Sequence, residues 1–124
     1  MRIGILEDNI FIGEMLQHGL QLEGHTVVVY YCPTEFLAHM SEPTIASTSF
    51  DLIIVDLFFS EGISGGEVIH HVRRILPDLP AIFIAVGSSW QIESARRALP
   101  TVRVLRKPFS MTILLTMIQE LQNF

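Results

Sequence analysis

Three acidic residues and one lysine follow short apolar runs in this sequence, where they could do chemistry together. Glu7 and Asp8 follow the run RIGIL, Asp56 ends the run LIIVD, and Lys107 follows VLR. Carboxylates that lie close together repel one another unless a cation sits among them. A small set of oxygen ligands suits Mg²⁺ (or Mn²⁺), and an ammonium nearby would neutralise an incoming phosphoryl group.

This combination of residues indicates phosphoryl transfer. The apolar run before Asp56 predicts a buried strand, which would hold the carboxylate rigidly. A rigid carboxylate can act as a nucleophile and become an acyl phosphate. Two simpler interpretations stay open from these residues alone. Glu7 and Asp8 would also suit the start of a helix, and Lys107 could be an ordinary surface lysine.

Apolar runs alternate with segments of helical spacing along the whole chain. The expected strands are residues 2–6, 26–31, 51–55, 81–86 and 102–105. The expected helices are 8–23, a segment starting at Pro33, 67–76, a segment from Ser88 or Ser89 to about 99, and a last one capped by Ser110. Residues 42–49 and 60–66 are expected to be loops, because they are rich in Ser, Thr, Pro and Gly.

Strands that are apolar on both faces and separated by helices predict a parallel sheet covered on both sides. The expected fold is therefore α/β, a doubly wound (βα)5 sandwich with a five-stranded parallel sheet. Sites in such open sheets lie at the carboxyl ends of the strands. Because the acids and the lysine all follow strands, we expect their side chains to meet at one edge of the sheet.

Three segments carry a resemblance to a known family. They are ILEDN (residues 5–9), LIIVDLFF (52–59) and LRKPF (105–109), each at the end of an expected strand. In this respect the chain resembles, from end to end, a response regulator receiver domain of two-component signal transduction, in the CheY-like superfamily. The resemblance implies one receiver domain over residues 1–124, with the flavodoxin-like receiver topology.

The resemblance also implies a role for each matching residue. Asp56 would be the phosphoacceptor, and Lys107 would pair with the phosphoryl group. Asp8 would bind Mg²⁺ directly, Glu7 directly or through water, and Phe58 through its backbone carbonyl. The Lys107–Pro108 bond would be cis, as is usual in the family. A cis bond before proline costs only about 0.5–1 kcal/mol.

The sequence departs from the family at its switch positions. Ala85 stands where the family has Thr or Ser, Val86 replaces a smaller residue, and Val104 replaces the switch aromatic. Ser60 also stands at a usual proline. Our hypothesis is that Asp56 is still phosphorylated but that the signal leaves by another route. Ser88 or Ser89 could supply a substitute hydroxyl, and the bulk of Val86 could slow both phosphotransfer and hydrolysis.

Composition limits the environment and the partners. The formal net charge of −5 gives no attraction to DNA phosphates, so we expect no direct nucleic-acid binding. Cys32 is the only cysteine, which excludes an internal disulfide. No signal peptide or membrane span is visible, so we expect a cytoplasmic protein without membrane contact. The expected partner is a sensor histidine kinase or a histidine phosphotransfer protein. An output domain outside this chain and a second copy of the chain are further candidates.

Two aromatic residues are candidates for partner contacts. Phe11 follows the acid pair, where a kinase or phosphotransfer protein could dock. Trp90 lies early in the fourth expected helix, on what the resemblance implies is the output surface; packing over its own domain is the alternative. We do not expect an enzyme beyond self-catalysed phosphorylation and dephosphorylation.

Three other functions are alternatives to this one. The main alternative is a pseudo-receiver, an interaction module whose output is independent of phosphate. A flavodoxin-like cofactor binder is disfavoured because no phosphate-binding loop follows the first strand. A phospho-aspartate hydrolase is disfavoured because no second acid lies two residues after Asp56.

Overall fold

A single parallel sheet organises the chain. The computed structural model describes residues 1–42, 50–57, 59, 63–86, 89–99 and 101–122. The strands are β1 (Arg2–Leu6), β2 (Thr26–Tyr30), β3 (Leu52–Asp56), β4 (Ala81–Ala85) and β5 (Arg103–Arg106). All neighbouring pairs are parallel, in the order β2-β1-β3-β4-β5. This confirms the predicted five-stranded sheet.

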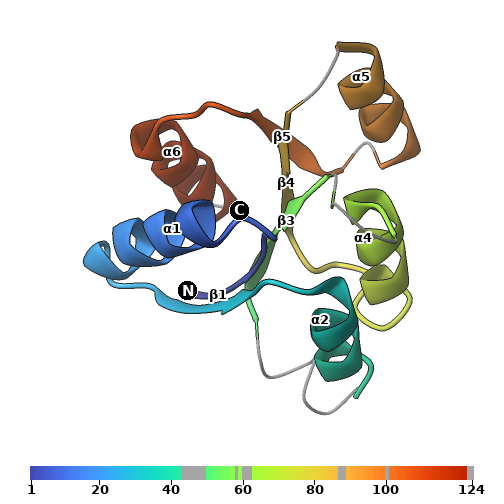
Figure 1. Cartoon of the computed structure of the whole chain (residues 1–124), viewed down its shortest axis with the longest axis horizontal. Coiled ribbons are helices and arrows are strands. Elements are labelled where there is room, and N and C mark those ends of the chain that lie inside the picture. The colour runs from blue at the N-terminus through green and yellow to red at the C-terminus, as the bar shows by residue number, and fades with distance from the viewer. Residues whose placement is uncertain (43–49, 58, 60–62, 87–88, 100, 123–124) are drawn as a thin grey trace.

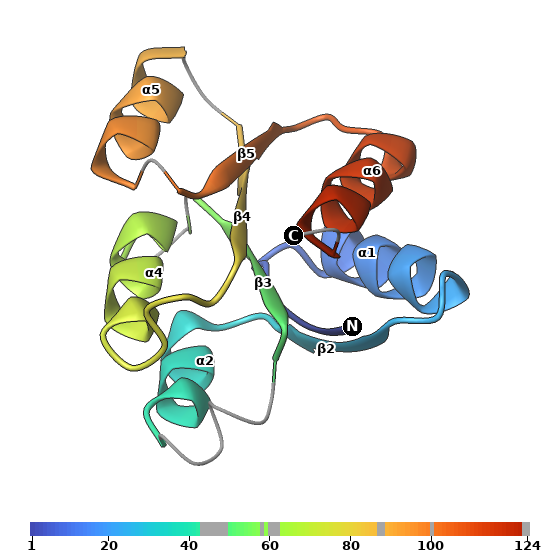
Figure 2. The ribbon, with the colours of Figure 1, turned by 180° about the vertical axis from the view of Figure 1, so that it is seen from behind.

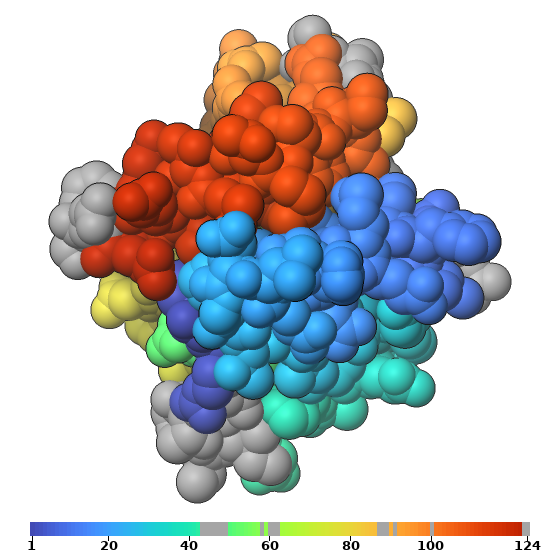
Figure 3. Space-filling view, turned by 90° about the vertical axis from the view of Figure 1, so that its left-hand side faces the viewer, coloured from blue at the N-terminus to red at the C-terminus, as the bar shows by residue number. Residues whose placement is uncertain are grey.

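Five helices in the described residues cover the two faces of the sheet. They are α1 (Ile10–Leu22), α2 (Pro33–Met40), α4 (Gly65–Arg73), α5 (Ser89–Ala98) and α6 (Met111–Gln122). Helices α1 and α6 lie on one face, and α2, α4 and α5 lie on the other (Figures 1 and 2). Figure 3 shows α1 and α6 side by side on the outside of their face. No helix in the described part of the chain is long and apolar enough to span a membrane.

The strands alternate between two hydrophobic cores because successive side chains point to opposite faces. In β3, Ile53 and Val55 pack with buried residues of α2, α4 and α5. Leu52 and Ile54 pack with buried residues of α1 and α6. All four side chains are essentially inaccessible to water, which explains why the strand is apolar throughout.

Local sequence signals fix several helix ends. Asn9 accepts a hydrogen bond from the Ile12 backbone N–H at the start of α1, and Ser110 accepts one from Ile113 at the start of α6. Gly24 follows α1 with a φ of +87°, a left-handed conformation that side chains disfavour. Because Asn9 caps α1, Glu7 and Asp8 are not needed as helix caps.

The third predicted helix is present, but it lies two to three residues earlier in the chain than expected. It was expected over residues 67–76, but α4 runs from Gly65 to Arg73. The Ser64 hydroxyl accepts the Glu67 backbone N–H and starts the helix earlier than expected. The helix ends at Arg73, and a turn follows in which the N–H groups of Ile75 and Leu76 both donate to the Val72 carbonyl. Other boundaries shift by one or two residues, and Asp56 is the last residue of β3.

Candidate functional site

The alternation of side chains directs three predicted site residues to the same side of the sheet. Asp56 lies two residues after Ile54, which packs on the α1 and α6 face. Glu7 lies two residues after Ile5, and Lys107 lies two residues after Leu105. Ile5 and Leu105 also pack on the α1 and α6 face. Because the strands are parallel, all three reach the same carboxyl edge of the sheet.

Lys107 joins two carboxylates across this edge. Its Nζ donates to Glu7 Oε1 at 2.6 Å and to Asp56 Oδ2 at 3.2 Å. Glu7 is fully buried, Asp56 is nearly so, and the Lys107 side chain is 14% exposed. The partners come from three strands, and Glu7 lies 100 positions from Lys107 in sequence. The site is therefore assembled by the fold and is shielded from most solvent.

The three acids form a group that suits a hard cation. One carboxylate oxygen from each of Glu7, Asp8 and Asp56 lies within 4.8 Å of the others. Glu7 Oε2 is buried and has no hydrogen-bond partner. A buried carboxylate oxygen without a partner is costly, and a divalent cation ligated by oxygen atoms would satisfy it. These residues therefore fit the predicted Mg²⁺ or Mn²⁺.

The electrostatics reflect this crowding. Burial raises the pKa of Glu7 to about 8, and the neighbouring Asp56 carboxyl acts in the same direction, against Lys107. Burial alone would lower the pKa of Lys107, but the carboxylates of Glu7 and Asp56 raise it above its usual value. One ammonium shared by crowded acids leaves an excess of negative charge, which a bound cation would balance.

The backbone of β4 and β5 holds Lys107 in place. Its N–H donates to the Ala85 carbonyl at 2.8 Å, which extends the pairing of β4 with β5. The Lys107–Pro108 peptide bond is cis. Next to it, the Leu57 N–H donates to the Ile84 carbonyl at 2.8 Å, so the end of β3 is held by the same strand.

The atypical switch positions lie on β4, directly after it, and on β5. Ala85 is buried at the end of β4 and offers no hydroxyl. Val86 follows it and is 61% exposed. Val104 pairs with Phe83 in the sheet and lines a hollow between α5 and α6. Ala85 therefore contacts the Lys107 backbone, Val86 lines a hollow beside Lys107, and Val104 packs on the α2, α4 and α5 face of the sheet.

Gly65 is a positioning residue that sequence reasoning missed. Its backbone N–H donates to the Leu57 carbonyl at 2.8 Å. A Cβ at Gly65 would collide with the carbonyl oxygen of Asp56 and lie 2.8 Å from Leu57 Cα. The start of α4 can therefore approach the end of β3 only with glycine here. The Gly65–Gly66 pair was the available signal, but it was assigned to a loop.

An apolar hollow of about 430 Å³ opens beside the lysine. It is lined by Ile12, Met15, Val86, Lys107, Pro108 and Phe109. Phe11 lies nearby in sequence and is 82% exposed, and Trp90 on α5 is 76% exposed. Ile12 and Met15 were predicted only as part of a helix face. Trp90 does not pack over its own domain, which was the alternative to a role in partner binding.

Some predicted residues lie outside the described part of the chain. These are Phe58, whose carbonyl was expected to bind the metal, together with Ser60 and Ser88. Nothing is described for the side chain of Ser89. The substitute hydroxyl therefore stays a prediction.

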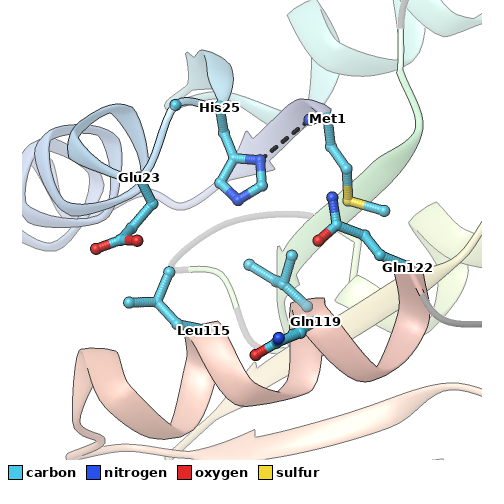
Figure 4. Close-up of a pocket in the computed structure, with 8 residues that line it drawn as sticks. Met1, Glu23, His25, Leu115, Gln119 and Gln122 are labelled. Atoms are coloured by element: carbon cyan, nitrogen blue, oxygen red, sulfur yellow. Dashed lines mark hydrogen bonds between the residues drawn. The ribbon is translucent and has the colours of Figure 1, made fainter.

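A second hollow, of about 380 Å³, lies at the opposite edge of the sheet, where the strands begin (Figure 4). His25 Nδ1 lies 3.1 Å from the amine of Met1, and Glu23 lies on the side of His25 that faces away from Met1. Gln119 and Gln122 of α6 close the other side. This hollow lacks the paired carboxylates and lysine of the first site.

Solved structures show what this chain is similar to. Chemotaxis protein CheY4 from Vibrio cholerae is 26% identical, with 95% of each chain covered and a TM-score of 0.79. Response regulator protein TrrA from Thermotoga maritima, in complex with Mg(2+)-BeF, is 27% identical over 97% of each chain, with a TM-score of 0.79. A response regulator receiver protein from Sinorhizobium medicae is 21% identical, with a TM-score of 0.84. The match covers 98% of this chain and 93% of the Sinorhizobium medicae chain.

No family model and no curated protein matches the sequence. The likeness is therefore carried by the structure and by the residues at the strand ends. The chain has the fold of CheY-like response regulator receiver domains, which confirms the resemblance and the predicted fold class. The similarity supports a receiver role in two-component signalling and fits a signalling domain rather than an enzyme.

Proposed function

We propose that this chain is a phosphoacceptor receiver domain in which Asp56 accepts a phosphoryl group. The observation that carries the proposal is the bridge from Lys107 to Glu7 and Asp56, beside a group of three carboxylates. A lysine and a cation site that share one aspartate provide the charge compensation that phosphoryl transfer requires. An ordinary structural ion pair would not need the extra acids.

Each residue then has a role in the transfer. A carboxylate oxygen of Asp56 attacks the phosphorus of a phosphohistidine, the P–N bond breaks, and its electron pair returns to the imidazole of the donor. Lys107 would pair with the phosphoryl oxygens. Glu7, Asp8 and Asp56 would hold Mg²⁺, with the Phe58 carbonyl as a further expected ligand. A bound metal would supply positive charge that offsets the charge of the phosphoryl oxygens.

The donor would be a histidine kinase or a histidine phosphotransfer protein, acting in the cytoplasm. The hollow beside Lys107 and the exposed ring of Phe11 give an apolar surface next to the acceptor. We infer that the donor protein docks there. The exposed Trp90 is a candidate for output contacts, with a partner or with an output domain outside this chain.

Labelling with a small phosphodonor tests the proposal. Wild type incubated with acetyl phosphate and Mg²⁺ should gain one phosphoryl group, detected by intact mass. Asp56→Asn should gain none, whereas Asp51→Asn, at the exposed start of the same segment, should be labelled like wild type. Chelation of Mg²⁺ should abolish labelling. Unchanged labelling of Asp56→Asn would refute the assignment.

A pseudo-receiver is the second candidate function. Ala85 and Val104 favour it, because neither can act in a hydroxyl–aromatic relay from the acceptor to the α5, β5 and α6 surface. The two candidates differ in what phosphate does. In a pseudo-receiver, partner binding or self-association is identical for wild type and Asp56→Asn under phosphorylating conditions; in a working receiver they differ.

A further inference from the structure

Strand β2 forms an edge of the sheet that lacks the usual protection. It is the first strand in the order, and no other described element lies beyond it (Figure 1). Its residues, TVVVY, include no charge and no proline. The opposite edge, β5, carries Arg103 and Arg106. Proteins normally protect edge strands with charges, prolines or bulges, because unpaired backbone groups recruit another strand.

The hydrogen bonds show which backbone groups of β2 are unpaired within the sheet. The Thr26 N–H donates to the Met1 carbonyl at 3.0 Å, and the Tyr30 carbonyl accepts the Glu7 N–H at 3.0 Å. Alternate residues of a parallel strand face the same neighbour. Thr26, Val28 and Tyr30 therefore face β1, and the N–H and carbonyl groups of Val27 and Val29 point to the open side.

The side chains along this edge also leave apolar surface uncovered. Val28 is 43% exposed, although it lies in the middle of a strand. A hollow of about 290 Å³ runs beside it on the α2 face, lined by Arg2, Thr26, Val28, Tyr30, His39 and Phe50. Helix α2 thus covers the carboxyl end of β2 and leaves the middle and the start open.

We propose that β2 is a homodimer interface, in which the β2 strands of two copies pair antiparallel across a two-fold axis at Val28. This register lets Val27 of one copy exchange both of its open backbone bonds with Val29 of the other. It brings the two Val28 side chains together on the α2 face. It also places the start of each β2, with its hollow, beside the carboxyl end of the other.

A second copy fits this edge better than an unrelated strand because the edge is complementary to itself. The outward N–H and carbonyl groups of Val27 and Val29 are all paired in the dimer, so this edge offers no further backbone group to a third chain. The arginines on β5 disfavour pairing at the other edge, so the assembly closes at two copies. The pairing involves neither Asp56 nor Lys107, so it goes beyond the proposed phosphoryl transfer and can fail independently of it.

The first experiment measures mass in solution over a concentration series. Wild type should rise towards twice the monomer mass. Val28→Lys should stay monomeric, because it places two ammonium groups at the axis. Val29→Pro should also stay monomeric, because it removes an outward donor that the sheet of the domain does not use. Ile113→Lys, an exposed apolar residue on α6, is the matched control and should dimerise like wild type.

The second experiment traps the register. Residues directly opposite in a non-hydrogen-bonded antiparallel pair have Cα atoms about 4.5 Å apart, within disulfide range. In a Cys32→Ser background, Val28→Cys should cross-link under mild oxidation much faster than Ile113→Cys. Circular dichroism checks that each variant is folded. A monomeric wild type, a dimeric Val28→Lys with dimeric Val29→Pro, or equal cross-linking at both cysteines would overturn the proposal.

Discussion

The ammonium of Lys107 lies 2.6 Å from Glu7 Oε1, and this buried pair joins the residue that follows β1 to the residue that follows β5. Glu7 therefore holds the lysine ammonium beside Asp56. Its second oxygen, Oε2, is left without a partner and is available to a cation. One residue thus serves both the lysine and the expected metal.

We expect Glu7→Gln to weaken Mg²⁺ binding about 10–100-fold, because the amide removes a negative charge from the carboxylate group. Isothermal titration with Mg²⁺ measures this directly, without any phosphorylation step. Glu14→Gln, an exposed position on α1, is the matched control and should bind like wild type. Equal affinity in Glu7→Gln would argue that Glu7 serves only Lys107.

Lys107→Met should slow acetyl phosphate labelling of Asp56 by at least about tenfold, because the ammonium that compensates phosphoryl charge is lost. Initial rates at saturating Mg²⁺ are the measurement, since they separate this effect from metal affinity. Lys107→Arg keeps the charge but not the compact geometry of the ammonium. Its labelling rate should lie between those of wild type and Lys107→Met. A labelling rate unaffected by Lys107→Met would remove the lysine from the proposed site.

Gly65→Ala should destabilise the domain by about 1–3 kcal/mol, the usual cost of inserting a group where no space exists. The added methyl would collide with the Asp56 carbonyl oxygen, so α4 or the end of β3 must move. Gly66→Ala is the control, because its Cβ meets only Ser64 Oγ at 3.6 Å. Urea unfolding of both variants makes the comparison, and equal stabilities would contradict the close approach.

Val86→Ala should shorten the lifetime of phosphorylated Asp56 several-fold. Val86 lines the hollow beside Lys107, and a smaller side chain would open a path for water to the acyl phosphate. The loss of phosphate after removal of the donor is followed by intact mass. Val28→Ala makes the same substitution at an exposed valine far from the site and should leave the lifetime of phosphorylated Asp56 unchanged. The same lifetime in both variants would mean that Val86 does not shield the acceptor.

Stability should fall with acidification partly through His25. Burial, followed by the positive charge of the Met1 amine, lowers the pKa of His25 from its ordinary 6.5 (Figure 4). The unfolded chain then binds a proton near pH 6.5 that the folded protein resists, so this penalty grows as pH falls from 6.5 and levels off below the folded-state pKa. Urea unfolding of His25→Gln should lack that component.

The control for this prediction is His18→Gln, an exposed histidine on α1, which should keep the wild-type pH dependence. The quantity to compare is the difference in unfolding free energy between wild type and each variant across pH. A constant difference for His25→Gln would show that burial at the start of β2 does not perturb this imidazole.

The sequence by itself determined the order of elements and the identity of the site residues. Apolar runs such as LIIVD require burial on both faces, and parallel strands must bring their carboxyl ends to one edge. Asp56, Glu7 and Lys107 were therefore predictable as neighbours. Caps such as Ser110 were also visible, because a cap acts through residues close to it in sequence.

The tertiary structure alone decided the contacts between those elements. It placed Lys107 closer to Glu7 than to Asp56, started α4 at Gly65 against the end of β3, and left Trp90 exposed. These outcomes depend on distances between segments far apart in the chain. The spacing of residues along the sequence does not encode such distances. They are set by side-chain packing, which is complete only when helices cover both faces of the sheet.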